Sequence, residues 1–288
     1  MLNLATKTHP LKIREFGFLF FHISIIIFSG YQAIETNQTI YFTILIYALL
    51  FLSISAHEFG HSFFGFLGGD WAVRSSGYLT LDFRKYANPY LTILTPIFTL
   101  IAFGVFMISA AVYIREHYIK SIFMRFMTHF GGVLFNALVI VALVYSKLFL
   151  STFFNNTLLL HSIDFVIYMN ALLILLNLLP IPPLDGFNIL LSPIESDYFK
   201  QQFLRIANPL GVFILIYFFY SSSAQEMQII SIVFEFIRSI LNIFYSLTGI
   251  TEESLENGLR LAKMDGSLIG DIRIILQKGI SALEDLFI

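Results

Sequence analysis

Seven long apolar stretches, separated by polar links, run along most of the chain. By hydropathy they cover residues 16–34, 41–67, 91–113, 129–150, 158–179, 209–220 and 229–247. About 20 apolar residues in a helix cross the hydrocarbon core of a bilayer, which is about 30 Å thick. The pattern therefore predicts an all-α polytopic membrane protein.

The positions of Lys and Arg orient these stretches by the positive-inside rule. Residues 1–14 and the loop after the second stretch each contain three basic residues: Lys7, Lys12 and Arg14, then Arg74, Arg84 and Lys85. The link 35–39 contains none. We therefore expect a cytoplasmic N-terminus, an outward-facing link and a second span that descends toward the cytoplasm.

The stretch 91–113 conflicts with this orientation if it crosses the membrane. The basic loop 115–125 that follows it would then lie outside. Pro96 and Gly104 are suitable break points, and non-helical backbone at membrane depth is tolerated where protein or a water cavity covers it. We favour a re-entrant hairpin over a crossing, which leaves about six transmembrane helices.

Two segments differ from the apolar stretches. Residues 77–83 alternate apolar and polar positions and are rich in strand formers, which predicts a short strand segment near the site discussed below. Residues 248–288 contain 11 charged residues at helical spacing. We divide the chain into a membrane domain, 1–247, and a small cytoplasmic tail, 248–288, which could pack on the membrane, bind a cytoplasmic partner or be solvated.

Composition agrees with a membrane setting and narrows the chemistry. The chain is 57% hydrophobic and 12% charged, whereas soluble domains contain roughly a quarter charged residues. A net charge of −2 leaves no basic excess, so we expect the lipid bilayer and no nucleic acid as a partner. Because the chain has no cysteine, any metal must be held by nitrogen and oxygen.

The pattern H-E-x-x-H stands within the second apolar stretch as His57, Glu58 and His61. On a helix, positions i and i+4 lie on one face at neighbouring turns, so both imidazoles can bind one ion. Glu58 stands beside them and can take a proton from metal-bound water. The alternative is that these side chains only satisfy one another between helices. Ionisable residues inside a membrane are functional candidates by default, which favours the metal site.

A hydrolytic zinc site needs a third protein ligand and an open position for water. The best candidate is Asp185, which follows three prolines in residues 177–186 at the end of an apolar stretch. The prolines break the helix and leave backbone groups free. The transmembrane span that contains Asn177 runs from outside to inside. Asp185 should therefore lie in the cytoplasmic leaflet, as His57 and His61 do. An interfacial turn is the alternative for this segment taken alone.

These motifs together resemble those of the site-2 protease family, zinc-dependent intramembrane proteases. The family motif H-E-x-G-H is matched from His57 to His61, and N-x-x-P-x-x-P-L-D-G by residues 177–186. A glycine-proline segment ending in asparagine is matched by residues 131–136, although Val133 replaces the usual proline. In one branch of the family, residues 77–82 and 111–114 also have counterparts, the second ending an inserted hydrophobic hairpin. The core match covers residues 51–191.

The resemblance implies one zinc ion per chain, held by His57, His61, Asp185 and water. It implies that Glu58 is the general base. It also implies that Asn177 lies near the zinc and helps to hold the substrate or the tetrahedral oxyanion.

Three further residues are weaker candidates. Asn136 could be functional or could serve only as interhelical glue, and neither is favoured. Leu81 and Val112 lie in the two segments that could pair with an unwound substrate as an added strand. They are the predicted substrate-binding residues.

The motifs predict an intramembrane zinc metalloprotease that cuts transmembrane or membrane-anchored protein substrates. We expect it in a bacterial cell membrane with both termini cytoplasmic. One alternative is a protein that keeps this fold without catalysis, as a binding protein, membrane chaperone or ion transporter. Another is a membrane zinc peptidase of a different family. The presence of Glu58 argues against the first and residues 177–186 against the second.

Overall fold

The computed structural model describes residues 16–87, 111–194, 197–220 and 239–262. All regular elements in these ranges are helical. Four long helices dominate: α1 (Gly17–Thr36), α2 (Thr39–Gly68), α6 (Ile122–Phe153) and α7 (Thr157–Asn177). The others are α3 (Ala72–Ser75), α4 (Phe83–Tyr86), η2 (Glu116–Tyr118), α8 (Asp185–Leu190), α9 (Asp197–Tyr220), Ser239–Thr248 and α12 (Glu252–Ala262).

The four long helices are each long enough and apolar enough to cross a membrane. They confirm the predicted spans 16–34, 41–67, 129–150 and 158–179. The stretch 209–220 forms the second half of α9, which begins earlier, at Asp197. Residues 88–110 lie outside the described ranges, so the re-entrant hairpin and the alternative crossing stay predictions, as does most of 229–247.

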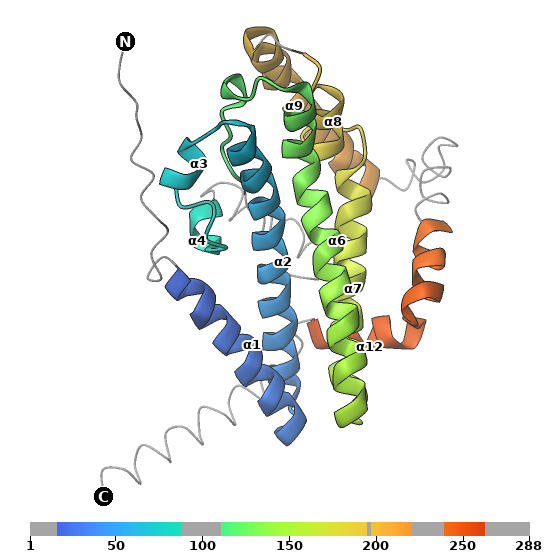
Figure 1. The fold of residues 1–288 in the computed structure, drawn as a ribbon. Helices are drawn as coiled ribbons and strands as arrows, with labels where there is room; N and C mark the ends of the chain where they lie inside the picture. The colour runs from blue at the N-terminus through green and yellow to red at the C-terminus, as the bar shows by residue number, and fades with distance from the viewer. Residues whose placement is uncertain (1–15, 88–110, 195–196, 221–238, 263–288) are drawn as a thin grey trace, which may run out of the picture.

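Helix α2 is the centre of the bundle, packing most extensively against α6 and also against α1, α7 and α12 (Figure 1). The α2–α6 crossing is very close at Gly60 and Gly131. A Cβ added to Gly60 would lie 2.3 Å from the carbonyl oxygen of Gly131, and the reverse distance is 2.5 Å. Small residues let membrane helices approach to backbone contact. The two glycines therefore determine how closely α6 faces the H-E-x-x-H motif.

Buried polar pairs add to this packing. Between α2 and α7, the Asn170 amide donates to the Ser53 hydroxyl at 3.0 Å. Between α6 and α7, Lys147 forms an ion pair with Asp164, whose side chain is only 4% exposed. Asp164 is thus held inside the bundle.

Helix α12 packs against the ends of α2 and α7 that lie far from the H-E-x-x-H motif. Thr43 and Tyr47, in the first turns of α2, donate to the carbonyl oxygens of Leu261 and Ala262. A Cβ on Gly258 would lie 2.4 Å from Cβ of Phe165 in the first half of α7. The described part of the tail is therefore docked rather than solvated. It lies at the end of the bundle opposite the H-E-x-x-H motif, and the cytoplasmic location of the tail stays a prediction.

The strand predicted over residues 77–83 was wrong. The segment forms turns that lead into α4, and no strand occurs in the described ranges. Gly77 and Leu81 adopt φ angles of 78° and 53°, which interrupt any extended run. Residues 111–114 are also irregular; Ala111 donates its backbone N–H to the carbonyl of Tyr86.

Candidate metal centre

Two histidines one helical turn apart form the base of the site. His57 and His61 project from the same face of α2, and their Nε2 atoms lie 3.1 Å apart. His61 is buried, and so is Glu58, the residue that follows His57. The predicted spacing of the two imidazoles on a helix is therefore observed.

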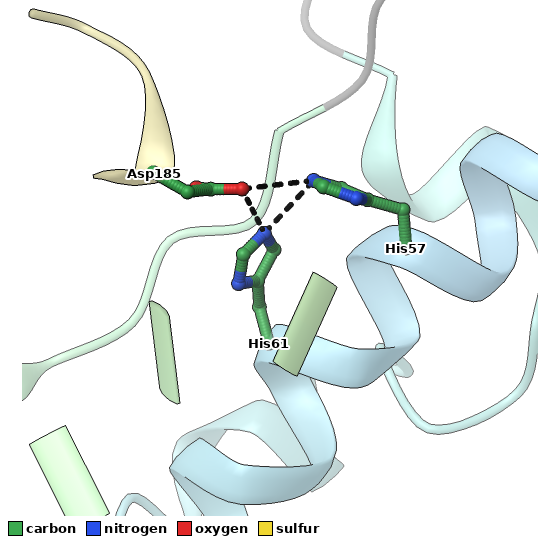
Figure 2. A group of neighbouring side chains, drawn as sticks. All are labelled: His57, His61 and Asp185. Carbon is green, nitrogen blue, oxygen red and sulfur yellow. Dashed lines mark hydrogen bonds and ion pairs between the residues drawn. The ribbon is translucent and has the colours of Figure 1, made fainter. Parts of the chain in front are cut away.

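Asp185 completes a triangle with the two histidines (Figure 2). Its Oδ2 atom lies 3.2 Å from Nε2 of His57 and 3.4 Å from Nε2 of His61. Asp185 is the first residue of α8, where the chain resumes a helix after the proline-rich break that follows α7. This break folds tightly, because a Cβ on Gly186 would lie 2.4 Å from the carbonyl oxygen of Leu178. The tight turn brings Asp185 back toward α2.

The backbone of α6 orients one imidazole. Nδ1 of His61 lies 2.7 Å from the carbonyl oxygen of Thr128, which can only accept, so Nδ1 carries the proton. Nε2 of His61 therefore presents a lone pair toward His57 and Asp185. Such a bond from the second ring nitrogen is the usual support of a metal-binding histidine.

The three atoms have the spacing of metal ligands. Ligand atoms about 2.0–2.1 Å from a tetrahedral zinc ion lie roughly 3.3–3.4 Å from one another. The observed separations are 3.1, 3.2 and 3.4 Å. Two nitrogen atoms and one carboxylate oxygen suit zinc, and a buried carboxylate beside two imidazoles suits a cation. His57, His61 and Asp185 could therefore hold a metal ion.

Gly132 of α6 forms one wall of this centre. A Cβ at Gly132 would lie 2.5 Å from both Cε1 of His57 and Nε2 of His61. Only a residue without a side chain leaves the imidazoles in their observed positions. Neither Gly132 nor the carbonyl of Thr128 was singled out from the sequence. For Gly132, the available signal in the sequence was the pair of glycines at 131–132 in an apolar helix. The backbone carbonyl of Thr128 leaves no signal in the sequence.

Glu58 points toward the segment that precedes η2. The backbone N–H of Val112 lies near the Glu58 carboxylate. The predicted substrate-binding residue Val112 therefore lies beside the predicted general base.

The other predicted residues differ in burial and in their place in the fold. Asn136, one turn beyond Gly132 on α6, is 1% exposed, and neither polar atom of its side chain has a partner among the described residues. Asn177 is half-buried at the C-terminal end of α7, where the proline-rich break begins. Leu81 lies between α3 and α4 with a left-handed backbone, an uncommon conformation for a branched side chain.

Comparisons with known proteins agree with the resemblance read from the motifs. Residues 151–218 match the model of peptidase family M50. The chain is 28% identical over 174 residues to Rip2 of Mycobacterium tuberculosis, described as a candidate zinc metalloprotease, and the alignment covers 60% of this chain. It is 29% identical over 173 residues to Rip2 of Mycolicibacterium smegmatis. The matched region spans 64% of the Mycobacterium tuberculosis protein and 65% of the other.

A more distant relative bears a similar description. YwhC of Bacillus subtilis, also described as a candidate zinc metalloprotease, is 25% identical over 58% of this chain and 81% of its own length. No solved structure matches the chain. The resemblance to the site-2 protease family is thereby confirmed at the level of sequence.

Proposed function

We propose that this relative of peptidase family M50 is a zinc-dependent endopeptidase that cuts membrane-spanning protein segments within the bilayer. The observation that supports this most directly is the triangle of His57, His61 and Asp185, with the carboxyl group of Glu58 on the same helix. A metal site needs only the triangle. A hydrolase needs a base beside it as well, and Glu58 is available for that task.

His57, His61 and Asp185 would hold one zinc ion per chain, with Thr128 fixing the tautomer of His61. When bound, zinc supplies a polarised substrate carbonyl and a water molecule that loses a proton near neutral pH. Glu58 accepts that proton and returns it to the leaving amine. The nearby backbone N–H of Val112 can help to orient the Glu58 carboxylate for both transfers.

Asn136 and Asn177 are the proposed amide donors of the site. The unpartnered amide of Asn136 can bond a substrate backbone or the oxyanion that forms during attack, and Asn177 lies where the Asp185 segment leaves α7. A donor aimed at a developing oxyanion contributes about 3–4 kcal/mol in well-studied hydrolases. Among the described residues the buried side chain of Asn136 has no partner, which leaves its amide available to a ligand.

A substrate helix must unwind before its peptide bonds can reach the centre, because helical backbone groups already bond one another. Leu81 and Val112 lie in two irregular segments, the second beside Glu58, and both segments can offer backbone groups to an unwound chain. Substrates with helix-breaking residues near the cleavage point should therefore be cut preferentially. The metal cluster lies at the end of the bundle that we assign to the cytoplasm.

The test is to co-express the protein with a panel of membrane-spanning segments and to follow their cleavage. Glu58→Gln keeps the shape of the side chain and removes the base, so cleavage should fall by at least 1,000-fold, about 4 kcal/mol. Glu252→Gln makes the same change on the exposed surface of α12 and should cleave normally. Zinc content should drop in Asp185→Ala and stay unchanged in Glu58→Gln.

Either of two results would reject the proposal. One is full cleavage by Glu58→Gln, and the other is unchanged zinc content in Asp185→Ala. Zinc binding without cleavage of any segment by the wild type would instead favour a non-catalytic relative of the family.

A further inference from the structure

Helix α9 is attached to the rest of the protein along one narrow stripe. Between residues 198 and 214, every side chain is exposed except those that recur at helical spacing on a single face. The residues of this stripe are Lys200, Leu204, Ala207, Asn208 and Gly211. Lys200 and Gly211, at its two ends, are buried. The contacts of these two residues therefore decide how α9 lies on the protein.

Lys200 fixes the first turn of α9. Its Nζ lies 2.5 Å from one carboxylate oxygen of Glu116, and the other oxygen lies 3.0 Å from Nε2 of His129. Burial raises the pKa of Glu116, but the hydrogen bond and charge of His129 and the nearby Lys200 outweigh burial and lower the pKa to about 2. The ion pair therefore stays charged and ties the start of α9 to η2 and α6.

Gly211, at the other end of the stripe, is in backbone contact with the proline-rich break before Asp185. A Cβ added to Gly211 would overlap the carbonyl oxygen of Pro182 and lie 2.5 Å from its carbonyl carbon. Ordinary contact begins at 3.4 Å, so α9 or the break would have to move by at least about 0.9 Å. Because both atoms belong to the backbone, no side-chain rotation relieves this overlap.

A movement of Pro182 should carry Asp185 with it. The N–H of Leu184 donates to the carbonyl oxygen of Ile181 at 2.9 Å, which closes a turn around Pro182 and Pro183. Asp185 is the next residue after this turn. The contact with Gly211 is therefore made by the turn that presents the proposed metal ligand.

Hydrogen bonds do not fix this turn to another part of the bundle. Three of the residues 180–184 are prolines, which have no backbone N–H to donate. Within the described ranges, the hydrogen bonds of residues 179–184 run only to α7, to α8 or within the turn. Packing must therefore position it, with α6 against α8 on one side and α9 on the other.

A second contact of α9 follows Asp185 in the chain. Phe187 of α8 stacks on Phe203 of α9, with ring centroids 6.0 Å apart. Arg125 of α6 donates to the carbonyl oxygen of Ser192 at 2.9 Å, beyond the end of α8, and keeps that end on the protein independently of α9. Helix α9 thus meets the chain both before and after the ligand.

We propose that Gly211 is a positioning residue that sets, through Pro182, how closely the Asp185 carboxylate approaches the two histidines. This inference rests on the proposed role of Asp185 as a zinc ligand. The missing side chain at 211 lets α9 lie on the turn while Oδ2 of Asp185 stays 3.2 and 3.4 Å from the imidazole nitrogens. Phe203 supports the same carboxylate from the other flank.

The test measures zinc affinity by competition with a chelator, and the visible spectrum of the cobalt-substituted protein, both in detergent. Gly211→Ala adds the methyl group, and Phe203→Ala removes the stacked ring. Val212→Ala and Phe213→Ala are the matched controls, because they shorten exposed side chains on the same helix.

In Gly211→Ala we expect zinc affinity to fall about 10- to 100-fold, as is usual when a group that orients a metal ligand is altered. The cobalt spectrum should change as Asp185 leaves its place in the coordination geometry. Phe203→Ala should lose at least about threefold and the two controls less than about twofold. In an Asp185→Ala background, Gly211→Ala should cause no further loss, because both changes act through the same ligand.

Wild-type zinc affinity in Gly211→Ala would overturn the proposal, since α9 would then have yielded in place of the turn. A further loss in the Asp185→Ala background would also overturn it, because Gly211 would then act by another route. If Gly211→Ala does not fold, Phe203→Ala decides by the same two measurements. Failure of the proposed metal site gives a different result, because Asp185→Ala itself then keeps its zinc affinity.

Discussion

Adding a single methyl group at Gly132 should damage the metal centre without touching a ligand. In Gly132→Ala the new Cβ would lie 2.5 Å from Nε2 of His61 and from Cε1 of His57. Ordinary contact begins at 3.4 Å, so the imidazoles or α6 must move by about 0.9 Å. Retreat of α6 would open the backbone contact between Gly131 and Gly60.

Such a shift is large for a metal site, in which ligand distances hold to about 0.2 Å. Overpacking a close-packed site costs about 1–3 kcal/mol, which corresponds to a loss of roughly 5- to 150-fold in zinc affinity. We expect a loss near the middle of that range, accompanied by a similar fall in cleavage at limiting zinc.

The assay is competition for zinc against a chelator of known affinity, with purified protein in detergent. Gly30→Ala is the matched control, because its Cβ would meet only Cδ1 of Leu45 at 4.0 Å in another long apolar helix. Wild-type zinc affinity in Gly132→Ala would refute the close packing of α6 on the two histidines. A loss of equal size in Gly30→Ala would show that the effect is not local.

Three further predictions concern the surroundings of the centre. Val112→Pro removes the backbone N–H that lies near Glu58, so cleavage should fall about tenfold or more. Val112→Ala keeps this N–H and should cleave within about threefold of the wild type, and equal rates in the two variants would exclude a role for the N–H. Asn136→Leu removes two buried polar atoms that have no partner among the described residues, so we expect the unfolding temperature to stay the same or rise by roughly 2–4 °C while cleavage falls. A lower unfolding temperature with normal cleavage would identify Asn136 as structural glue. The pKa of Glu116 is lowered from 4.5 to about 2, so its contribution to stability, up to roughly 3 kcal/mol, is present above pH 4.5 and lost as the pH falls toward 2. The difference in unfolding temperature between wild type and Glu116→Gln should therefore narrow from pH 6 to pH 3, and a constant difference would contradict the lowered pKa.

Much of the architecture could be predicted because it is local. The four long helices follow from the length of their apolar stretches, and the placement of His57 and His61 follows from helical spacing alone. Asp185 was predicted from the proline-rich break before it and from the direction of the transmembrane span that precedes this break. The structure places its carboxylate beside the two histidines. The prediction of a strand over residues 77–83 was wrong, because alternating polarity does not supply a partner strand. The left-handed backbone at Leu81 also prevents an extended conformation there.

The location of α12 illustrates the opposite case. Charge and helical spacing identified an amphipathic segment beyond residue 247, but not the surface that it covers. Part of that surface is formed by Thr43 and Tyr47 of α2, more than 200 residues earlier in the chain. Side-chain hydroxyl groups that cap a distant helix have no signature in either segment.

The sequence by itself determined the membrane setting, the four long helices and the chemical types of the candidate ligands, because hydropathy and helical periodicity depend on neighbours within a few turns. Only the tertiary structure decided that Gly132 faces the two imidazoles, that the carbonyl of Thr128 orients His61, and that Lys200 meets Glu116 across 84 residues. These contacts depend on which faces of separate helices meet and how closely. Backbone contact at Gly60 and Gly131 determines that closeness, and no single helix encodes it.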